Sequence, residues 1–326
     1  MPQQTADYGY GGHQKPNRAA SLAPLWRAVR RTAASWAIIA ITIAAIWFGR
    51  SSADAHMQGI YRAAEFFLAY VVIDPFLIAP LILMSRLKHE AKANYMPLAK
   101  EEFPATVADS ARYLDAVRAL ERLGFEPARN AWRTTKHANM FVATFIHPVN
   151  YDGAVLAFAQ SAMRDVSLLT IWTRFDDGTS LDTSNYPLGG LFRENPMHPI
   201  HRFPQFSDAA SLYAAHRELL GRRRSSARKI QLKPEMMIGM LDDATERTFA
   251  YQAAQGDLVL GPTGEWYGYT FRGAWRHAAL SAWWIKPLRQ MQNEWRAARE
   301  LRELGLLRDE RVSGALRPDL DNRPLG

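Results

Sequence analysis

Three histidines in the second half of the chain are the residues with the most potential for chemistry. Two residues separate His198 from His201, and His216 follows in the next predicted helix. Imidazoles at this spacing can approach one metal ion, with His216 or a carboxylate as a third ligand. However, the pair lies in a proline-rich stretch, and no HExxH helix motif occurs. Because isolated histidines usually make ordinary hydrogen bonds, we predict no metal and no other cofactor.

A short polar segment, residues 182–185 (DTSN), could supply a nucleophile and an orienting carboxylate. Ser184, Asp182 and either His198 or His201 are the residue types of a nucleophile–base–acid set. The G-x-S-x-G elbow that usually presents such a serine does not occur. Since short polar residues also end strands and cap turns, whether the protein is an enzyme stays open.

Composition narrows the remaining chemistry. The chain has no cysteine, which excludes disulfides, thiolate catalysis and cysteine-based zinc sites. Neither a GxxxxGK[ST] nor a GxGxxG phosphate-binding motif occurs. A net charge of +8 favours anionic partners. Without a nucleic-acid reader motif we expect no nucleic acid, and we predict the anionic headgroups of a lipid bilayer as the partner.

Two apolar segments precede all of these residues. Residues 32–49 carry no charge, and as a helix they would be about 27 Å long, close to the thickness of a hydrocarbon core. Residues 66–84 form the second segment, which Asp74 and Pro75 interrupt. The sequence therefore predicts an N-terminal two-helix transmembrane hairpin over residues 32–85.

Asp74 needs an explanation, because an ionised carboxylate near the bilayer centre costs about 2.5–3.5 kcal/mol. Asp is a favoured helix N-cap and Pro a favoured first helical residue, so Asp74-Pro75 could restart a kinked helix. Alternatively, Asp74 is a functional intramembrane acid that relays ions or contacts a protein partner in a membrane complex.

The basic residues around the two segments predict the orientation. Five lysines and arginines precede the first segment and four follow the second, whereas only Arg50 and Arg62 lie between the two. Basic flanks remain on the cytoplasmic side. We therefore expect a multi-pass protein of the plasma (inner) membrane with both termini in the cytoplasm.

The rest of the chain predicts a cytoplasmic α+β domain. We expect a disordered basic leader (1–31), a basic stalk (86–103), the domain itself (104–305) and a loose tail (306–326). Within the domain, β-rich runs separated by short turns predict an antiparallel β-meander covered by helices. The Asp177-Gly178 pair between two of these runs is the strongest hairpin signal. The runs cover residues 139–147, 154–161, 166–175 and 179–185.

The last predicted element is a long C-terminal amphipathic helix that begins after Gly273. Its first half combines tryptophans with basic residues, a pattern that suits the headgroup region of a membrane. The tryptophans would equally suit the domain core. The candidate membrane-interface residues are Trp275, Trp283, Trp284, Arg272, Arg276, Lys286 and Arg289.

The sequence is compatible with three functions. The first is a non-enzymatic membrane-anchored domain that binds a protein, a ligand or a lipid surface. The second is a membrane-tethered hydrolase or metal-dependent enzyme that uses the His198/His201/His216 group. The third is an accessory subunit of a membrane complex, based on Asp74.

Overall fold

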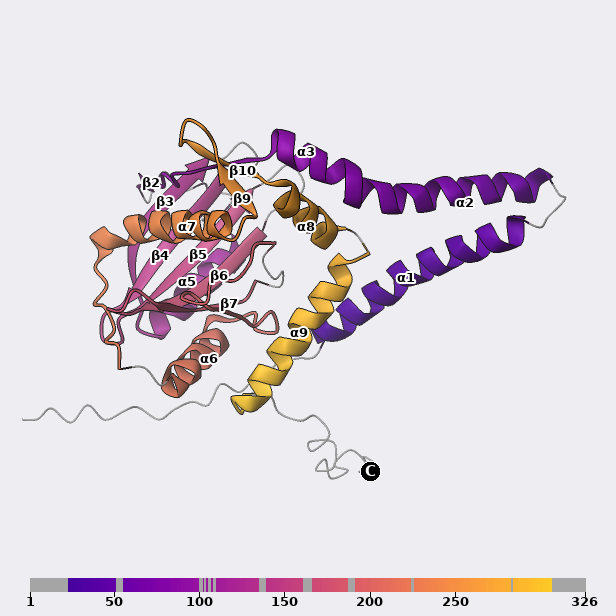
Figure 1. Cartoon of the computed structure of the whole chain (residues 1–326). Coiled ribbons are helices and arrows are strands. Elements are labelled where there is room, and N and C mark those ends of the chain that lie inside the picture. Colours follow the sequence, from indigo (N-terminus) through magenta and orange to yellow (C-terminus); the bar gives the residue numbers. More distant parts are fainter. Residues whose placement is uncertain are drawn as a thin grey trace, which may run out of the picture.

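The computed structural model describes residues 23–50, 55–99, 102, 104, 107, 110–134, 139–160, 166–186, 191–223, 226–282 and 284–306. A seven-stranded sheet with helices on both of its faces forms the body of the protein (Figure 1). The structure thus confirms the predicted α+β class. Most of the predicted leader and nearly all of the predicted tail lie outside the described residues.

The large sheet has the strand order β2-β3-β4-β5-β6-β7-β8. Neighbouring strands are antiparallel, except that β7 and β8 are parallel. The run from β4 to β7 is the predicted meander, and Gly178 adopts the left-handed φ of +80° in its last hairpin. The strands are β2 (Met96–Leu98), β3 (Glu126–Thr134), β4 (Asn139–His147), β5 (Asp152–Gln160), β6 (Val166–Arg174), β7 (Ser180–Ser184) and β8 (Ile200–Arg202).

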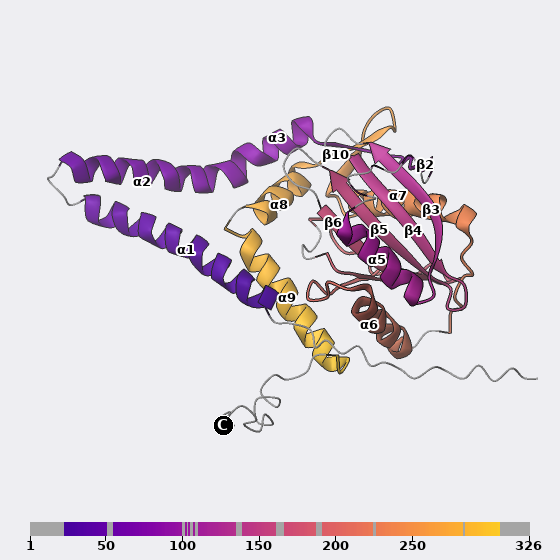
Figure 2. The same cartoon turned by 180° about the vertical axis from the view of Figure 1, so that it is seen from behind.

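Helices cover the two faces of this sheet unequally. Helices α5 (Ala111–Arg122) and α6 (Ala209–Arg222) lie on one face, and α7 (Met237–Ala254) lies on the other (Figure 2). Successive side chains of a strand point to opposite faces. Accordingly, Ile171 of β6 is buried in the larger core with α5 and α6, whereas its neighbour Trp172 is buried in the smaller core with α7.

The stretch predicted as a basic stalk contains two short strands. β1 (Lys88–Glu90) pairs with β10 (Trp266–Tyr269), which in turn pairs with β9 (Leu258–Leu260). Strand β2 joins the edge of the large sheet beside β3. The chain that leaves the apolar helices is therefore hydrogen-bonded into the domain at once. Strands of three residues are too short to show an alternating pattern in a sequence.

Two antiparallel helical arms extend from the domain (Figure 1). The first arm is α1 (Ala23–Arg50), and the second contains α2 (Ala55–Ile73) and α3 (Ala79–Arg86). Among the described residues, one helical stretch, His56–Arg86, is long and apolar enough to cross a membrane. The apolar part of the first arm, Thr32–Phe48, is shorter. The described residues thus contain one candidate membrane span rather than the two that the sequence predicts.

Asp74 lies inside the second arm, where the helix does not restart. Asp74–Ile78 form a π-helical turn between α2 and α3. No side chain caps the N-terminal end of this turn. Pro75 and Pro80 are both buried. A π-turn absorbs the backbone hydrogen bonds that prolines remove, so the helix continues through them.

The C-terminal region contains two helices where the sequence predicts one. Helix α8 (Phe271–Ser281) ends before residues 282–285, and α9 (Lys286–Glu303) then begins with Pro287 in its first turn. Proline is favoured there because the first turn of a helix needs no backbone donor. In both views the two arms separate toward the domain, and α8 and α9 lie in the opening between them (Figures 1 and 2).

Candidate functional site

An aromatic cluster joins the two arms to the C-terminal helices. It consists of Trp36, Phe76, Trp275 and Trp284. The ring of Trp284 lies 5.7 Å from that of Trp36 on the first arm and 6.2 Å from that of Phe76 on the second. Trp275 of α8 lies 5.6 Å from Phe76 and stays 44% exposed. Two of the predicted interface tryptophans therefore contact the apolar arms, and Trp283 lies outside the described residues.

The four basic residues predicted beside these tryptophans divide into two pairs. Arg276 forms an ion pair with Asp257 at 3.0 Å, and Arg289 donates to the Leu280 carbonyl oxygen. These two arginines thus have partners within the protein. Arg272 and Lys286 are exposed.

The five candidate catalytic residues do not form one site. His216 is fully buried on the α6 face of the sheet, and His198 lies on the α7 face. His201 pairs with Glu300 of α9 beside a separate hollow. The Ser184 hydroxyl donates to the Leu169 carbonyl oxygen and is itself buried. Among the described residues, no three histidine, aspartate or glutamate side chains are placed to hold a metal ion.

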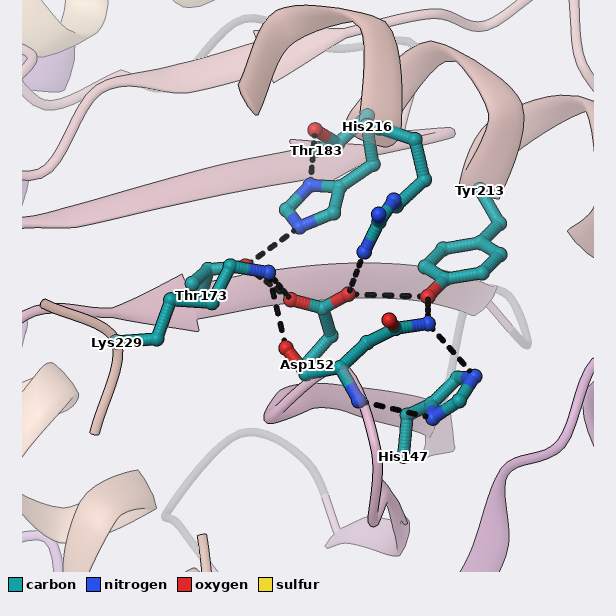
Figure 3. Close-up of polar contacts among 9 residues, drawn as sticks. His147, Asp152, Thr173, Thr183, Tyr213, His216 and Lys229 are labelled. Atoms are coloured by element: carbon teal, nitrogen blue, oxygen red, sulfur yellow. Dashed lines mark hydrogen bonds and ion pairs between the residues drawn. The ribbon is translucent and has the colours of Figure 1, made fainter. Parts of the chain in front are cut away.

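His216 belongs instead to a buried polar network on the α6 face (Figure 3). Its Nδ1 lies 2.9 Å from the Thr183 hydroxyl, and its Nε2 lies 2.9 Å from the Thr173 hydroxyl. Thr173 donates to Asp152 at 2.6 Å, and the Tyr213 hydroxyl donates to the other carboxylate oxygen at 3.0 Å. The network links three strands of the meander, β5, β6 and β7, to the helix that covers them.

Asp152 is the centre of this network, because its fully buried carboxylate has several partners. Lys229 lies 2.8 Å from one oxygen and Arg217 lies 3.6 Å from the other. Burial alone would raise the pKa of Asp152, but nearby His216, Lys229 and the Thr173 hydroxyl together lower it. The carboxylate is therefore ionised near pH 7, and its charge is balanced inside the protein.

Burial has the opposite effect on the histidine of the network. It lowers the pKa of His216 to about 3 against the attraction of Asp152, so the imidazole is neutral near pH 7. A neutral imidazole has one donor and one acceptor nitrogen, which suits its two threonine partners. The sequence signal for this burial is that His216 follows Leu212 by one helical turn and so shares its apolar face.

A pocket of about 440 Å³ opens on the other face of the sheet, between β6, β7 and α7. His198 and Asp182, two of the candidate catalytic residues, line it. Arg174 and Arg247 also line it, although neither stood out in the sequence. The predicted hairpin could have indicated Arg174 as a neighbour of Asp182. Arg174 pairs with Ser180 across the hairpin, and Ser180 points to the same face of β7 as Asp182.

The polar groups of this pocket are only partly satisfied. Arg174 is 8% exposed, and its Nε has no hydrogen-bond partner among the described residues; the same is true of one buried oxygen of Asp182. The Nη1 atom of Arg174 lies 3.4 Å from Nδ1 of His198. Nδ1 of His198 also lies 3.0 Å from the Ser180 hydroxyl. Buried groups without partners are uncommon and mark places where a further group can bind.

Burial also shifts the charges in the pocket. It lowers the pKa of His198 to about 4, with Arg174 as the second cause, so this histidine is neutral near pH 7. It raises the pKa of Asp182 despite the attraction of Arg174. Both effects leave the arginines as the dominant charges of the site.

Gln252 fixes the loop that closes one side of the pocket. Its fully buried amide accepts from the Arg193 backbone N–H at 3.0 Å and donates to the Arg193 carbonyl oxygen at 2.9 Å. The Arg193 guanidinium reaches Asp257 at 2.8 Å, and Asp257 also pairs with Arg276 of α8. The pocket wall is thereby attached to the helix that contacts the apolar arms.

Comparison with known proteins adds no family. No protein-family model matches the chain, and searches of curated proteins and of solved structures find no significant similarity. The fold and the pocket therefore define the class only: an α+β domain attached to apolar helical arms, with a closed polar network on one face of its sheet and an open pocket on the other.

Proposed function

We propose that the protein is anchored in the membrane by a two-span hairpin and that its α+β domain binds a ligand at the cytoplasmic surface without catalysis. The proposal is carried by the aromatic cluster, in which Trp284 contacts both arms where they diverge from each other. Tryptophan favours the interface between hydrocarbon and water. The cluster therefore marks the level at which the arms would enter the bilayer and the domain would remain outside.

The exposure of the arms supports this placement. Large apolar side chains such as Ile41, Trp47 and Phe66 are between 68% and 78% exposed. An apolar surface of this extent is costly in water and favourable in a bilayer. The apolar part of the first arm, Thr32–Phe48, is short for a span, but α1 extends from Ala23 to Arg50, so its flanking residues and a local thinning of the bilayer can complete the span.

The pocket supports the ligand-binding part of the proposal. Its lining contains His198 and Asp182, but the candidate nucleophile Ser184 is buried and donates elsewhere. Ser180, the hydroxyl next to His198, is itself fully buried. A concave site with convergent polar groups fits binding, and the assembled set that nucleophilic catalysis needs is lacking among the described residues.

Cysteine labelling tests the topology, because the natural chain contains no cysteine and gives a blank background. Ser52→Cys places a thiol in the segment that joins the arms, and Ser207→Cys places one on the exposed surface of the domain. In intact cells, a membrane-impermeant maleimide should label the Ser52→Cys variant only. Ser207→Cys should be labelled after lysis. Protection of both thiols until lysis, or labelling of Ser207→Cys in intact cells, would contradict the two-span cytoplasmic arrangement.

A further inference from the structure

The pocket on the α7 face has positive charge that the protein itself does not balance. Two of its four arginines have carboxylate partners, because Arg193 pairs with Asp257 and Arg202 pairs with Glu194. Arg174 and Arg247 remain. The ion pair of Arg247 with Asp243 is exposed and 3.5 Å long, and such surface pairs contribute little.

Asp182 and His198 do not cancel this charge. Asp182 is the one carboxylate beside Arg174 in the pocket lining, and burial opposes its ionisation. His198 is neutral near pH 7 and can offer a ring nitrogen as a donor or an acceptor. Two guanidinium groups therefore face the cavity opposite a weakened counter-charge, an arrangement that suits an anion.

Hydrogen bonding points to an oxygen ligand. The Nε atom of Arg174 is buried without a partner among the described residues. Guanidinium groups bind phosphate and carboxylate oxygens through paired, charge-assisted hydrogen bonds. An oxyanion in the pocket would give Arg174 the partner that the protein does not supply.

The remaining walls indicate that the ligand is larger than an inorganic ion. Phe192, Leu241 and Phe249 line the same cavity together with Ile200 and Tyr251. A volume of about 440 Å³ lies within the range of small-molecule sites. Apolar walls beside two arginines favour a ligand with an apolar body and one charged end.

We propose that this pocket binds an organic oxyanion, a phosphate or carboxylate joined to an aromatic or aliphatic body. The oxyanion lies between Arg174 and Arg247, and the body lies against Phe192 and Phe249. The inference rests on the proposed ligand-binding role and gives that role a chemical class. It does not depend on how the arms cross the membrane.

The position of the pocket allows two sources for such an anion. Phe192 and Phe249 belong to a separate hydrophobic cluster that also contains Leu83 and Leu87, at the end of the second arm. The apolar end of the pocket therefore adjoins the base of the predicted span. Both a soluble organic anion and a lipid headgroup could reach it, and they share the chemistry that the arginines recognise.

Titration calorimetry on the full chain in phosphatidylcholine nanodiscs tests the proposal with phenyl phosphate as the probe. Phenyl phosphate should bind more tightly than inorganic phosphate, because only the former fills the apolar walls. Arg247→Gln should weaken phenyl phosphate binding about 10-fold or more, as expected for the loss of one charge-assisted hydrogen bond. The Arg247 side chain is 40% exposed, so this variant should fold normally.

Arg118→Gln is the matched control, since Arg118 is an exposed arginine of α5 on the opposite face of the sheet. It should bind phenyl phosphate as the natural protein does. Equal affinities of the natural protein and Arg247→Gln would overturn the proposal. So would the failure of phenyl phosphate, benzoate and phosphatidic acid alike to bind. In either case the cysteine-labelling result for the anchor would still stand.

The source of the anion is decided in the same assay. Phosphatidic acid added to the nanodisc should lower the apparent affinity for phenyl phosphate several-fold if the pocket takes lipid headgroups. Unchanged affinity would assign the pocket to soluble anions. Under either result Arg247→Gln must bind phenyl phosphate more weakly than Arg118→Gln does.

Discussion

The two faces of the large sheet use the same kinds of polar side chain in opposite ways. On the α6 face, Asp152 and His216 are fully buried, and each has neighbours that complete its hydrogen bonds. On the α7 face, Arg174 and Asp182 are also shielded, but each has an atom without a partner among the described residues. One face is closed and electrically balanced, and the other is open and positively charged.

Structural and functional polar groups differ in whether the protein itself supplies their partners. A buried network with every partner in place stabilises a specific fold, whereas a buried charge without its partner costs stability. Proteins accept such a cost where a ligand supplies the missing partner. The comparison predicts that substitutions on the α6 face reduce stability, and that substitutions on the α7 face reduce ligand binding.

The largest expected effect is at the centre of the closed network. Asp152→Ala removes a buried carboxylate and leaves Lys229, Tyr213 and Thr173 without their partner, so we expect the free energy of unfolding to fall by about 3–5 kcal/mol. Urea unfolding in detergent, followed by tryptophan fluorescence, measures this change. Asp115→Ala on the exposed side of α5 serves as a control with a loss below about 0.5 kcal/mol. A loss below 1 kcal/mol at Asp152 would show that the network is dispensable.

An intermediate effect should appear as a pH dependence. The pKa of His216 is about 3 in the folded protein and about 6.5 when unfolded, so between these values only the unfolded chain takes up the proton. The free energy of unfolding should therefore decrease as the pH falls below 6.5. His216 should contribute nearly one proton to the slope between pH 5 and pH 6, or about 1.4 kcal/mol per pH unit.

The variant His216→Gln should remove that contribution, so its free energy of unfolding should depend less steeply on pH. Arg118→Gln should keep the pH dependence of the natural protein. Urea unfolding at a series of pH values provides the measurement. His198 also has a lowered pKa, of about 4, so part of the slope remains in the variant. Parallel curves for His216→Gln and the natural protein would contradict the burial of a neutral imidazole.

The smallest effect on stability is expected in the open pocket. Arg174→Met replaces a buried guanidinium that has an unpaired Nε with an apolar chain of comparable length. Because burial already raises the pKa of the neighbouring Asp182, this carboxyl can take up a proton when the arginine is removed, so the free energy of unfolding should change by less than about 1 kcal/mol. Phenyl phosphate binding should nevertheless be lost in the calorimetric assay. A large loss of stability together with retained binding would reverse the assignment of the two faces.

Much of the fold could be predicted from local patterns. The strands from β4 to β7 and the Asp177-Gly178 hairpin follow from alternating apolar residues and turn chemistry. Strand β3 was not predicted, because Pro127 and a register shift before Asn130 interrupt its alternation. Such a strand is fixed by pairing with β2 and β4, and a single sequence does not display pairing.

The candidate site was less predictable than the fold. The sequence singled out His198, His201 and His216 as one group, yet the sheet separates His216 from His198 and α9 provides a partner for His201. Asp152 was visible only as part of a turn. Its partners Tyr213 and Lys229 lie more than sixty residues further along the chain, so no local pattern could connect them.

Residue types and short-range spacing are sufficient to predict the apolar arms, the meander and the absence of cysteine chemistry. Which polar groups have hydrogen-bond partners depends on the tertiary structure. Burial and partnership arise when α6 closes over one face and α7 leaves a pocket on the other. Arg174 lies in a predicted strand and Asp152 in the turn before one, and only their surroundings make the first a candidate ligand contact and the second part of the core.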